Sequence, residues 1–176
     1  MKKQLVMGLA TAMAFTMSGV SAFAATTGDK EVPVTYDNRN IIPDPENPGE
    51  TAQWGVSVPT AIVFTVTAKT KMADVELMGI NGGKLSDLSD TFEVEVKTKS
   101  KNGMKLYLDA AGKDDVAYTL AYGGTSLTGT TESKIATLMK TPDKAKQAGT
   151  ATLTGTATKL GSHIDTLTYT IENTVK

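Results

Sequence analysis

The feature that most constrains the fold is a repeated alternation of apolar and polar residues with a period of two. In the stretch TFEVEVKTKS, residues 91–100, Phe92, Val94 and Val96 alternate with charged side chains. Successive side chains of a strand point to opposite faces, so this pattern is typical of a half-buried β-strand. The same alternation recurs, with turn signals between the segments, at 31–36, 54–58, 62–66, 75–80, 104–108, 116–122, 150–160 and 167–171.

These segments predict an all-β domain, a two-sheet antiparallel β-sandwich of Ig-like or related type with about nine strands. A closed barrel is the alternative, but barrels that bind ligands usually have longer strands. One stretch departs from the pattern: in residues 131–149, Ile135, Leu138 and Met139 fit a helical turn that Pro142 would end. We expect one short helix or an irregular crossover there, and a 3₁₀ turn or a wide loop at LSDLSD, residues 85–90.

The first 24 residues are typical of a signal peptide. Lys2 and Lys3 precede an apolar run at 5–20, and AFA at 22–24 is a small-x-small cleavage site. An uncleaved membrane anchor is the alternative, although the apolar run is short for a bilayer span. We therefore expect export, cleavage after Ala24, and no membrane span in the mature chain.

The mature chain divides into two parts. Residues 25–53 form a polar leader, a first strand at 31–36 and a loop with Pro43, Pro45 and Pro48. Proline lacks an N–H and fixes φ, so this loop is predicted to be extended and to lie on the surface, without a helix or a central strand. Residues 54–176 form the sandwich domain, which the first strand is expected to join.

Charge and residue usage exclude several classes of function. The chain has 18 basic and 19 acidic residues, and loss of Lys2 and Lys3 leaves 16 against 19, a net charge of −3. A mildly acidic surface without a basic patch argues against nucleic-acid binding. The chain contains no cysteine and one histidine, His163, which excludes thiol chemistry and an ordinary zinc site. His163 lies in a predicted hairpin turn, where we expect a solvated side chain.

Carboxylates offer the remaining candidates for chemistry. Glu93 and Glu95 lie on one face of a strand, and a glycosidase needs two such acids beside a sugar. Lys97 and Lys99 follow on that face and favour a self-compensating charged stripe. Asp114 and Asp115 are explained by turn chemistry. The proline-rich loop offers oxygen ligands for calcium, namely Asp37, Asn38, Asp44, Glu46 and Asn47. The alternative is an ordinary surface loop, in which Asp, Asn and Pro are common. We expect no catalytic residue, cofactor or metal.

Trp54 marks the point where the proline-rich loop meets the first strong strand. It is in phase with Val56 and Val58, which favours a core residue that plugs one end of the sandwich. An exposed platform for stacking on a sugar is the alternative.

Several segments resemble the WxL-domain surface proteins of Firmicutes. They are VTYDNRNIIPDPENPG with WGVSVPTAIVFT, then VELMGING, KTKSKNGMKLYL and the closing TLTYTIEN. In TLTYTIEN, Tyr169 and Ile171 stand where the family has Trp and Leu, and Trp54-Gly55-Val56 mirrors its second W-x-L element. The resemblance implies a non-covalent association with the Gram-positive cell wall.

The predicted function follows from export, the strand pattern and the resemblance. We expect a non-enzymatic secreted or cell-surface protein whose partners are cell-wall peptidoglycan or other surface proteins. The candidate contact residues are Trp54, Val56, Tyr169 and Ile171. A subunit of a surface fibre that assembles by β-strand addition, with the polar leader before Val32 as a donor strand, is the alternative. A wall-glycan hydrolase that uses Glu93 and Glu95 is a lesser alternative.

Overall fold

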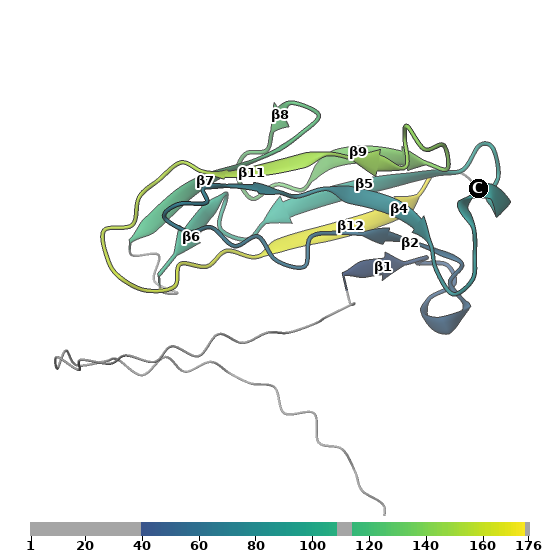
Figure 1. Cartoon of the computed structure of the whole chain (residues 1–176), viewed down its shortest axis with the longest axis horizontal. Coiled ribbons are helices and arrows are strands. Elements are labelled where there is room, and N and C mark those ends of the chain that lie inside the picture. The colour runs from purple at the N-terminus through teal and green to yellow at the C-terminus, as the bar shows by residue number, and fades with distance from the viewer. Residues whose placement is uncertain (1–39, 109–113, 175–176) are drawn as a thin grey trace, which may run out of the picture. The chain divides into compact units, whose positions relative to one another are not determined.

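Twelve strands and two three-residue 3₁₀ helices make up the described part of the chain, residues 40–108 and 114–174 of a computed structural model. The strands pair antiparallel throughout, which confirms the all-β sandwich-like fold (Figure 1). They form three hydrogen-bonded sheets where two were expected. The predicted signal peptide (1–24), the leader and the strand at 31–36 lie outside the described residues. None of the described helices is long and apolar enough to cross a membrane.

The first sheet contains the strand that begins at Trp54. Its order is β1 (Ile41–Pro43), β2 (Trp54–Ser57), β4 (Val75–Gly79) and β10 (Lys146–Gln147). Strand β1 falls within the segment predicted as an extended loop, and it lies at the sheet edge. An edge is the place where Pro43, which lacks an N–H, can pair without breaking a ladder.

The second sheet is centred on the long strand β7 (Asp115–Tyr122). Its order is β3 (Thr70–Met72), β11 (Gly149–Leu153), β7 and β6 (Lys105–Tyr107), and β8 (Thr125–Ser126) also pairs with β7. Hydrogen bonds between Tyr107 and Ile164, of 3.0 and 2.9 Å, continue the pairing beyond β6. The chain then runs from Ile164 directly into the closing strand.

The third sheet consists of β12 (Leu167–Asn173), β5 (Glu93–Ser100) and β9 (Ser133–Met139), with β5 in the centre. The alternation predicted for β5 is confirmed, because Val94, Val96, Thr98 and Ser100 are all fully buried. The closing strand behaves as expected too: Ile171 is buried and Tyr169 half-buried, while Thr170 is exposed. At the other edge, β9 lies next to β10 and β4 of the first sheet.

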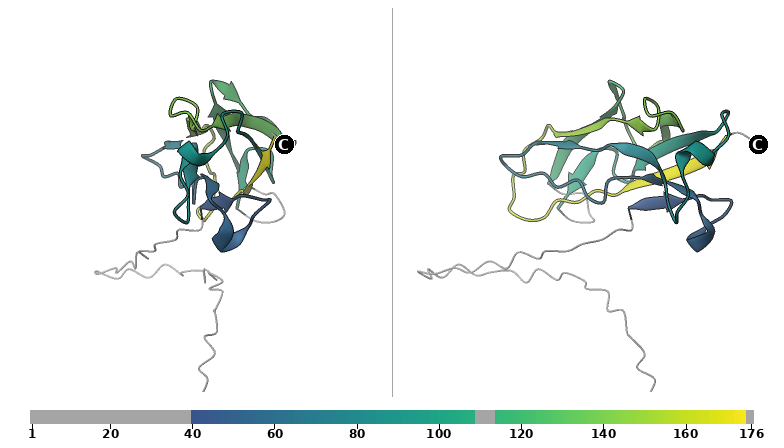
Figure 2. Two further views of the ribbon diagram at one scale, coloured as in Figure 1. Left: turned by 90° about the vertical axis from the view of Figure 1, so that its right-hand side faces the viewer. Right: turned by 45° about the vertical axis from the view of Figure 1, so that its right-hand side comes forward.

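The inner faces of the three sheets enclose one hydrophobic core (Figure 2). Each sheet contributes large buried side chains, among them Leu77 of β4, Leu120 of β7 and Leu138 of β9. Trp54 and Phe92 close one part of this core with a T-shaped contact between ring centroids 5.0 Å apart. This contact links the start of β2 to the residue before β5.

The helix or crossover predicted at 131–149 is wrong, since residues 133–139 form strand β9. The register of β9 against β5 shifts between Val96 and Lys97, where Ala136 pairs with Val96 and Lys134 with Lys97. Ile135 is the extra residue of this bulge, and Ile135 and Ala136 are both buried. The bulge changes the phase of the alternation by one residue, which produces the apolar spacing that resembles a helical turn.

Residues 58–69 were predicted to include a strand at 62–66, but this segment contains no strand. Ile62 and Phe64 are half-buried against the core, whereas Val63 and Val66 are 63% and 91% exposed. The segment ends in a turn in which Thr65 Oγ1 accepts a hydrogen bond from Ala68 N–H (2.9 Å) and lies 3.3 Å from the hydroxyl of Thr67. At its end, Lys69 O accepts a hydrogen bond from Leu153 N–H of β11 (2.8 Å), but residues 59–68 make no backbone hydrogen bond to a described strand. The 3₁₀ turn expected in LSDLSD is present at Leu85–Asp87.

Candidate functional site

In the part of the chain that the structure describes, the backbone of residues 167–171 in β12 is hydrogen-bonded along one edge only. At its ends, Lys101 N–H donates to Thr166 O (2.8 Å) and Thr174 N–H donates to Glu93 O (3.1 Å). In an antiparallel pair, hydrogen-bonded residues alternate with residues whose backbone groups face away. The even-numbered residues of β12 therefore bond to β5, and the backbone groups of Leu167, Tyr169 and Ile171 face the opposite edge. Within residues 40–108 and 114–174, neither a strand nor a backbone hydrogen bond occupies that edge at these three residues.

A groove of about 600 Å³ runs beside this free edge, and we call it the β12 groove. Five parts of the chain line it: Ile42 of β1, the segment 58–64, Leu106 of β6, Tyr118 of β7, and the residues 165–169 that lead into and begin β12. The lining is largely apolar, with Ile42, Val58, Phe64, Leu167 and Tyr169. The groove exists because residues 58–64 cover the core without pairing with β12.

Tyr169 places an aromatic ring and a hydroxyl in the β12 groove. The ring is half-buried, and its hydroxyl lies 3.0 Å from that of Tyr122 on β7. Burial raises the pKa of Tyr169 and of Tyr122 above the usual value of 10. Both hydroxyls therefore stay protonated, and the pair ties the closing strand to the second sheet.

Asp165 forms the polar floor of the same groove. Its carboxylate accepts hydrogen bonds from Ser100 Oγ (2.6 Å) and Tyr118 OH (2.7 Å), and from the backbone N–H groups of Asn102 (3.0 Å) and Thr166 (2.7 Å). Burial and the hydrogen bond to Asp165 raise the pKa of the Tyr118 hydroxyl. With four donors around it, this carboxylate fixes the turn before β12, and Ser100 is engaged as a donor.

Three of the four predicted contact residues lie in the core. Trp54 is 4% exposed, Val56 0% and Ile171 8%, so none of them presents a surface to a partner. The expectation that these three make external contacts therefore fails in this conformation, because they pack between the sheets. The core alternative for Trp54 is the one observed. Tyr169 alone among the four reaches a groove.

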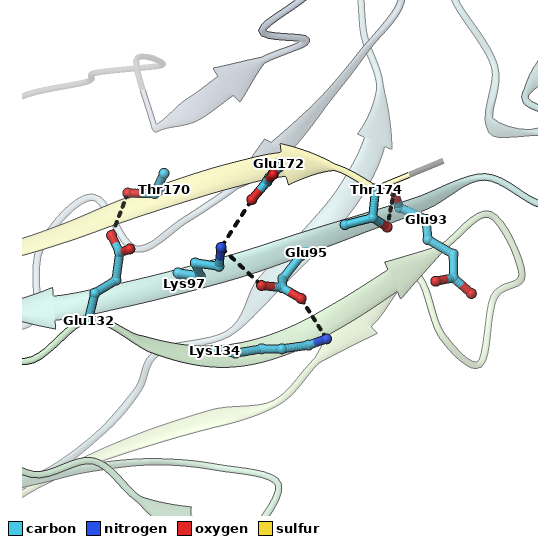
Figure 3. A network of polar contacts seen from close by, with 8 residues as sticks. All are labelled: Glu93, Glu95, Lys97, Glu132, Lys134, Thr170, Glu172 and Thr174. Atoms are coloured by element: carbon cyan, nitrogen blue, oxygen red, sulfur yellow. Dashed lines mark hydrogen bonds and ion pairs between the residues drawn. The ribbon is translucent and has the colours of Figure 1, made fainter. Parts of the chain in front are cut away.

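Glu93 and Glu95 are not a matched pair of free acids. Glu95 lies 3.1 Å from Lys97 Nζ and 2.7 Å from Lys134 Nζ, and Lys97 also reaches Glu172 at 3.0 Å (Figure 3). Hydrogen bonds from Lys134 and Lys97 lower the pKa of Glu95, whereas a general acid needs a raised one. In Figure 3 the Glu93 side chain points away from this network. The arrangement matches the self-compensating stripe on the outer face of the third sheet.

His163 is not the solvated turn residue that the sequence predicts. Its side chain is 8% exposed, and Nε2 lies 2.7 Å from Oδ2 of Asp114, which is 3% exposed. Asp114 also accepts hydrogen bonds from the hydroxyl and N–H of Thr158 and from the N–H of Lys159. The carboxylate thus clamps the loop 156–163, and the hydrogen bonds from Thr158 and His163 hold its pKa well below 3.8.

A second groove of about 660 Å³ adjoins the first along residues 62–64. The two share four residues, and the second also includes His163; the shared residues are Ile62, Phe64, Leu106 and Asp165. Val63, Val66 and Ile164 line it and are mostly exposed. The exposed apolar side chains around residues 62–66 thus lie between two hollows.

The described part of the proposed calcium loop is organised by Asp44. This residue is 6% exposed, and its carboxylate accepts hydrogen bonds from Glu46 N–H (2.9 Å) and Asn47 Nδ2 (3.1 Å). Asp44 N–H donates to Trp54 O (3.1 Å), which fastens the loop to the start of β2. Asp37 and Asn38 lie outside the described residues. Among the described residues, no cluster of His, Asp or Glu has the arrangement of a metal site.

Sequence reasoning missed Asp165, Tyr118 and Phe64 as parts of a site. A signal for Asp165 was present, since it has the same parity as Leu167, Tyr169 and Ile171 and therefore points inward. Thr98 and Ser100 likewise occupy the inward phase of β5. Polar residues in an inward phase indicate a buried network that must find partners.

No model of a protein family matches the chain, and no curated protein is detectably similar to it in sequence.

Proposed function

We propose that this chain is a non-enzymatic, exported surface protein that binds the Gram-positive cell wall or partner surface proteins non-covalently through the β12 groove. The observation that carries the proposal is the groove itself, an apolar hollow of about 600 Å³ that places Tyr169 beside an unpaired strand edge. Large open apolar hollows on a soluble domain are typical of binding sites. The signal-like residues 1–24 and the resemblance to WxL-domain proteins support the location.

The acidic side chains and the histidine that could act in catalysis support a binding role over a hydrolytic one. Glu95 is paired with two lysines, Asp165 accepts four hydrogen bonds, and His163 is paired with Asp114. A catalytic acid or base must be within hydrogen-bond reach of a substrate. Glu95, Asp165 and His163 instead bond to other residues of the chain.

Binding of the purified exported chain to isolated cell walls, peptidoglycan and surface-protein extracts tests the proposal. Ala61 is exposed and lines the β12 groove, so Ala61→Asp places a charge in the groove without disturbing the core. Thr67→Asp is the matched control, since Thr67 is exposed on the same segment and lines neither groove. We expect A61D to lose binding and T67D to retain it. Equal binding by both variants, or no binding by the native chain, would refute the proposal.

A second candidate function is that of a subunit of a surface fibre that assembles by β-strand addition. The specific observation in its favour is the free edge at residues 167–171, where the backbone groups of Leu167, Tyr169 and Ile171 lack a partner among the described segments. Proteins usually protect such an edge with proline, a bulge or an inward charge, and residues 167–171 have none of these. An edge left open in this way is suited to accept a strand.

A further inference from the structure

We propose that the β12 groove accepts residues Glu31–Tyr36 of a second copy of this chain, which add as a strand antiparallel or parallel to β12 and join the copies head to tail. This inference rests on the second function proposed above, and it names both the acceptor edge and the donor. It is carried by the backbone of β12, the lining of the groove, and the sequence and position of the donor.

The acceptor offers two things that an added strand needs. The backbone groups of Leu167, Tyr169 and Ile171 face the free edge and supply hydrogen-bond donors and acceptors. Beside them, Val58 and Phe64 line a groove that can receive the side chains of alternate residues. A strand in this place would extend the third sheet by one member and fill the hollow.

The donor is defined by its sequence, EVPVTY. Val32, Val34 and Tyr36 alternate with Glu31, Pro33 and Thr35, so one face of an extended segment is apolar. The apolar face matches the lining of the groove, and the polar face would continue the outer surface on which Thr168 and Thr170 are exposed. The donor and the groove are thus complementary in pattern.

Pro33 fits this arrangement and explains why assembly would stop at one added strand per groove. In an extended segment, successive backbone N–H groups point to opposite edges. When Val32 and Val34 pair with β12, the nitrogen of Pro33 faces the outer edge, where no hydrogen bond is needed. A proline on the new edge also blocks the addition of a further strand.

The donor precedes the first described residue, Asn40, by only a short segment. Only residues 37–39 separate Tyr36 from Asn40, whose carbonyl accepts a hydrogen bond from Val58 N–H (2.8 Å). Asn40 is also tied to Ser57 and Val58 through its side chain. Asn40, four residues after Tyr36 in the sequence, is thus bonded to Val58, which lines the β12 groove. A head-to-tail contact of this kind uses two different surfaces and generates open chains or rings.

Analytical ultracentrifugation of the exported chain provides the first test. Val34→Asp charges the apolar face of the donor, and Thr35→Asp places the same charge one residue away on the polar face. We expect concentration-dependent oligomers for the native chain and for T35D, and monomers for V34D. A native chain that stays monomeric at all concentrations would overturn the inference, as would equal effects of the two variants.

A mixing experiment distinguishes strand addition from other association. V34D retains its groove and cannot donate, whereas A61D has an intact donor and a charged groove. Each variant should be monomeric alone, and the mixture should form a 1:1 heterodimer that cannot grow. Absence of the heterodimer would contradict a donor-to-groove contact.

Disulfide trapping identifies the contact directly because the chain contains no cysteine. Copies carrying Thr35→Cys are mixed with copies carrying Thr170→Cys, and Thr150→Cys on the second sheet serves as the control. Mass spectrometry should find the peptide of residue 35 linked to that of residue 170 and not to that of residue 150. A double variant, T35C with T170C, that closes only within single chains would refute exchange between copies.

The outcome is separable from that of wall binding. If V34D is monomeric and still binds walls, binding does not depend on assembly. If the native chain binds walls but never self-associates, the present inference fails together with self-assembly into a fibre, and wall binding stands. If the native chain self-associates but V34D and T35D behave alike, assembly stands and only the donor assigned here is wrong.

Discussion

The hydroxyls of Tyr122 and Tyr169 lie 3.0 Å apart and join the closing strand β12 to the central strand β7 of another sheet. Tyr122 is 4% exposed, and Tyr169 reaches from the core into the β12 groove. Strand β12 lies at the edge of its sheet, and no described strand pairs with its other side. The tyrosine pair therefore fixes the groove wall as well as the fold.

Replacing Tyr169 by Phe is expected to lower the free energy of unfolding by about 1 kcal/mol, because the buried hydroxyl of Tyr122 loses its partner. Tyr122→Phe should have a similar effect. The double variant should be less destabilised than the sum of the two, since both hydroxyls are then absent. Urea unfolding, monitored by the fluorescence of Trp54, measures the stability of the native chain, the two single variants and the double variant. Strict additivity would show that the two hydroxyls do not interact.

Removal of the Asp165 carboxylate should be more costly than loss of one hydroxyl pair. Asp165→Ala leaves the buried hydroxyls of Ser100 and Tyr118 without their acceptor, and we expect a loss on the order of 3 kcal/mol. Urea unfolding measures this loss. Asp143→Ala provides the control, since Asp143 is exposed in the turn after β9. Equal stabilities for the two variants would argue against a structural role for Asp165.

The strands that sequence reasoning predicted well are those whose alternation is uninterrupted. In β5, the side chains of Glu93 to Ser100 follow one phase from end to end, and the structure keeps that phase. The closing strand is similar, with Leu167, Tyr169 and Ile171 inward. In each case a single physical rule, burial of one face, determines the pattern.

The errors arose where tertiary contacts change a local rule. The bulge at Ile135 shifts the phase of β9, and only the pairing with β5 reveals it. Ile62 and Phe64 alternate like strand residues, but no described strand is adjacent to pair with them. His163 is buried because Asp114, 49 residues away, holds its loop. Such long-range partners leave no local signal in the sequence, so the grooves could not be predicted.

The Asp114 clamp predicts how the loop 156–163 responds to acid. The folded-state pKa of Asp114 lies below its ordinary value of 3.8, owing to hydrogen bonds from Thr158 and then His163. A depressed pKa contributes stability that is complete above 3.8 and is lost as the pH falls through the lower folded value. We expect the native chain to lose stability below about pH 4 in part through this group. Asp114→Asn should be less stable at pH 7 and show a smaller fall in acid.

Urea unfolding at several pH values measures this difference, and carboxyl NMR follows Asp114 itself. An Asp114 resonance that titrates near 3.8 would contradict the clamp, as would identical acid profiles for the native chain and D114N.

The ion-pair network around Glu95 predicts a specific, salt-sensitive effect on stability. Lys97 and Lys134 are direct cross-strand partners, an arrangement that like charges disfavour, and the Glu95 carboxylate lies between them. Glu95→Gln should therefore lower Tm by roughly 1–3 °C at low ionic strength, and added salt should reduce the difference. Glu93→Gln is the matched control on the same strand face, since the Glu93 side chain points away from the network (Figure 3). Differential scanning calorimetry with and without salt measures the effect.

Because the network is structural, neither variant should change the turnover of wall glycan in the presence of the protein. A hydrolytic activity that disappears in both E93Q and E95Q would instead identify these carboxylates as catalytic and reject the binding function proposed for the chain.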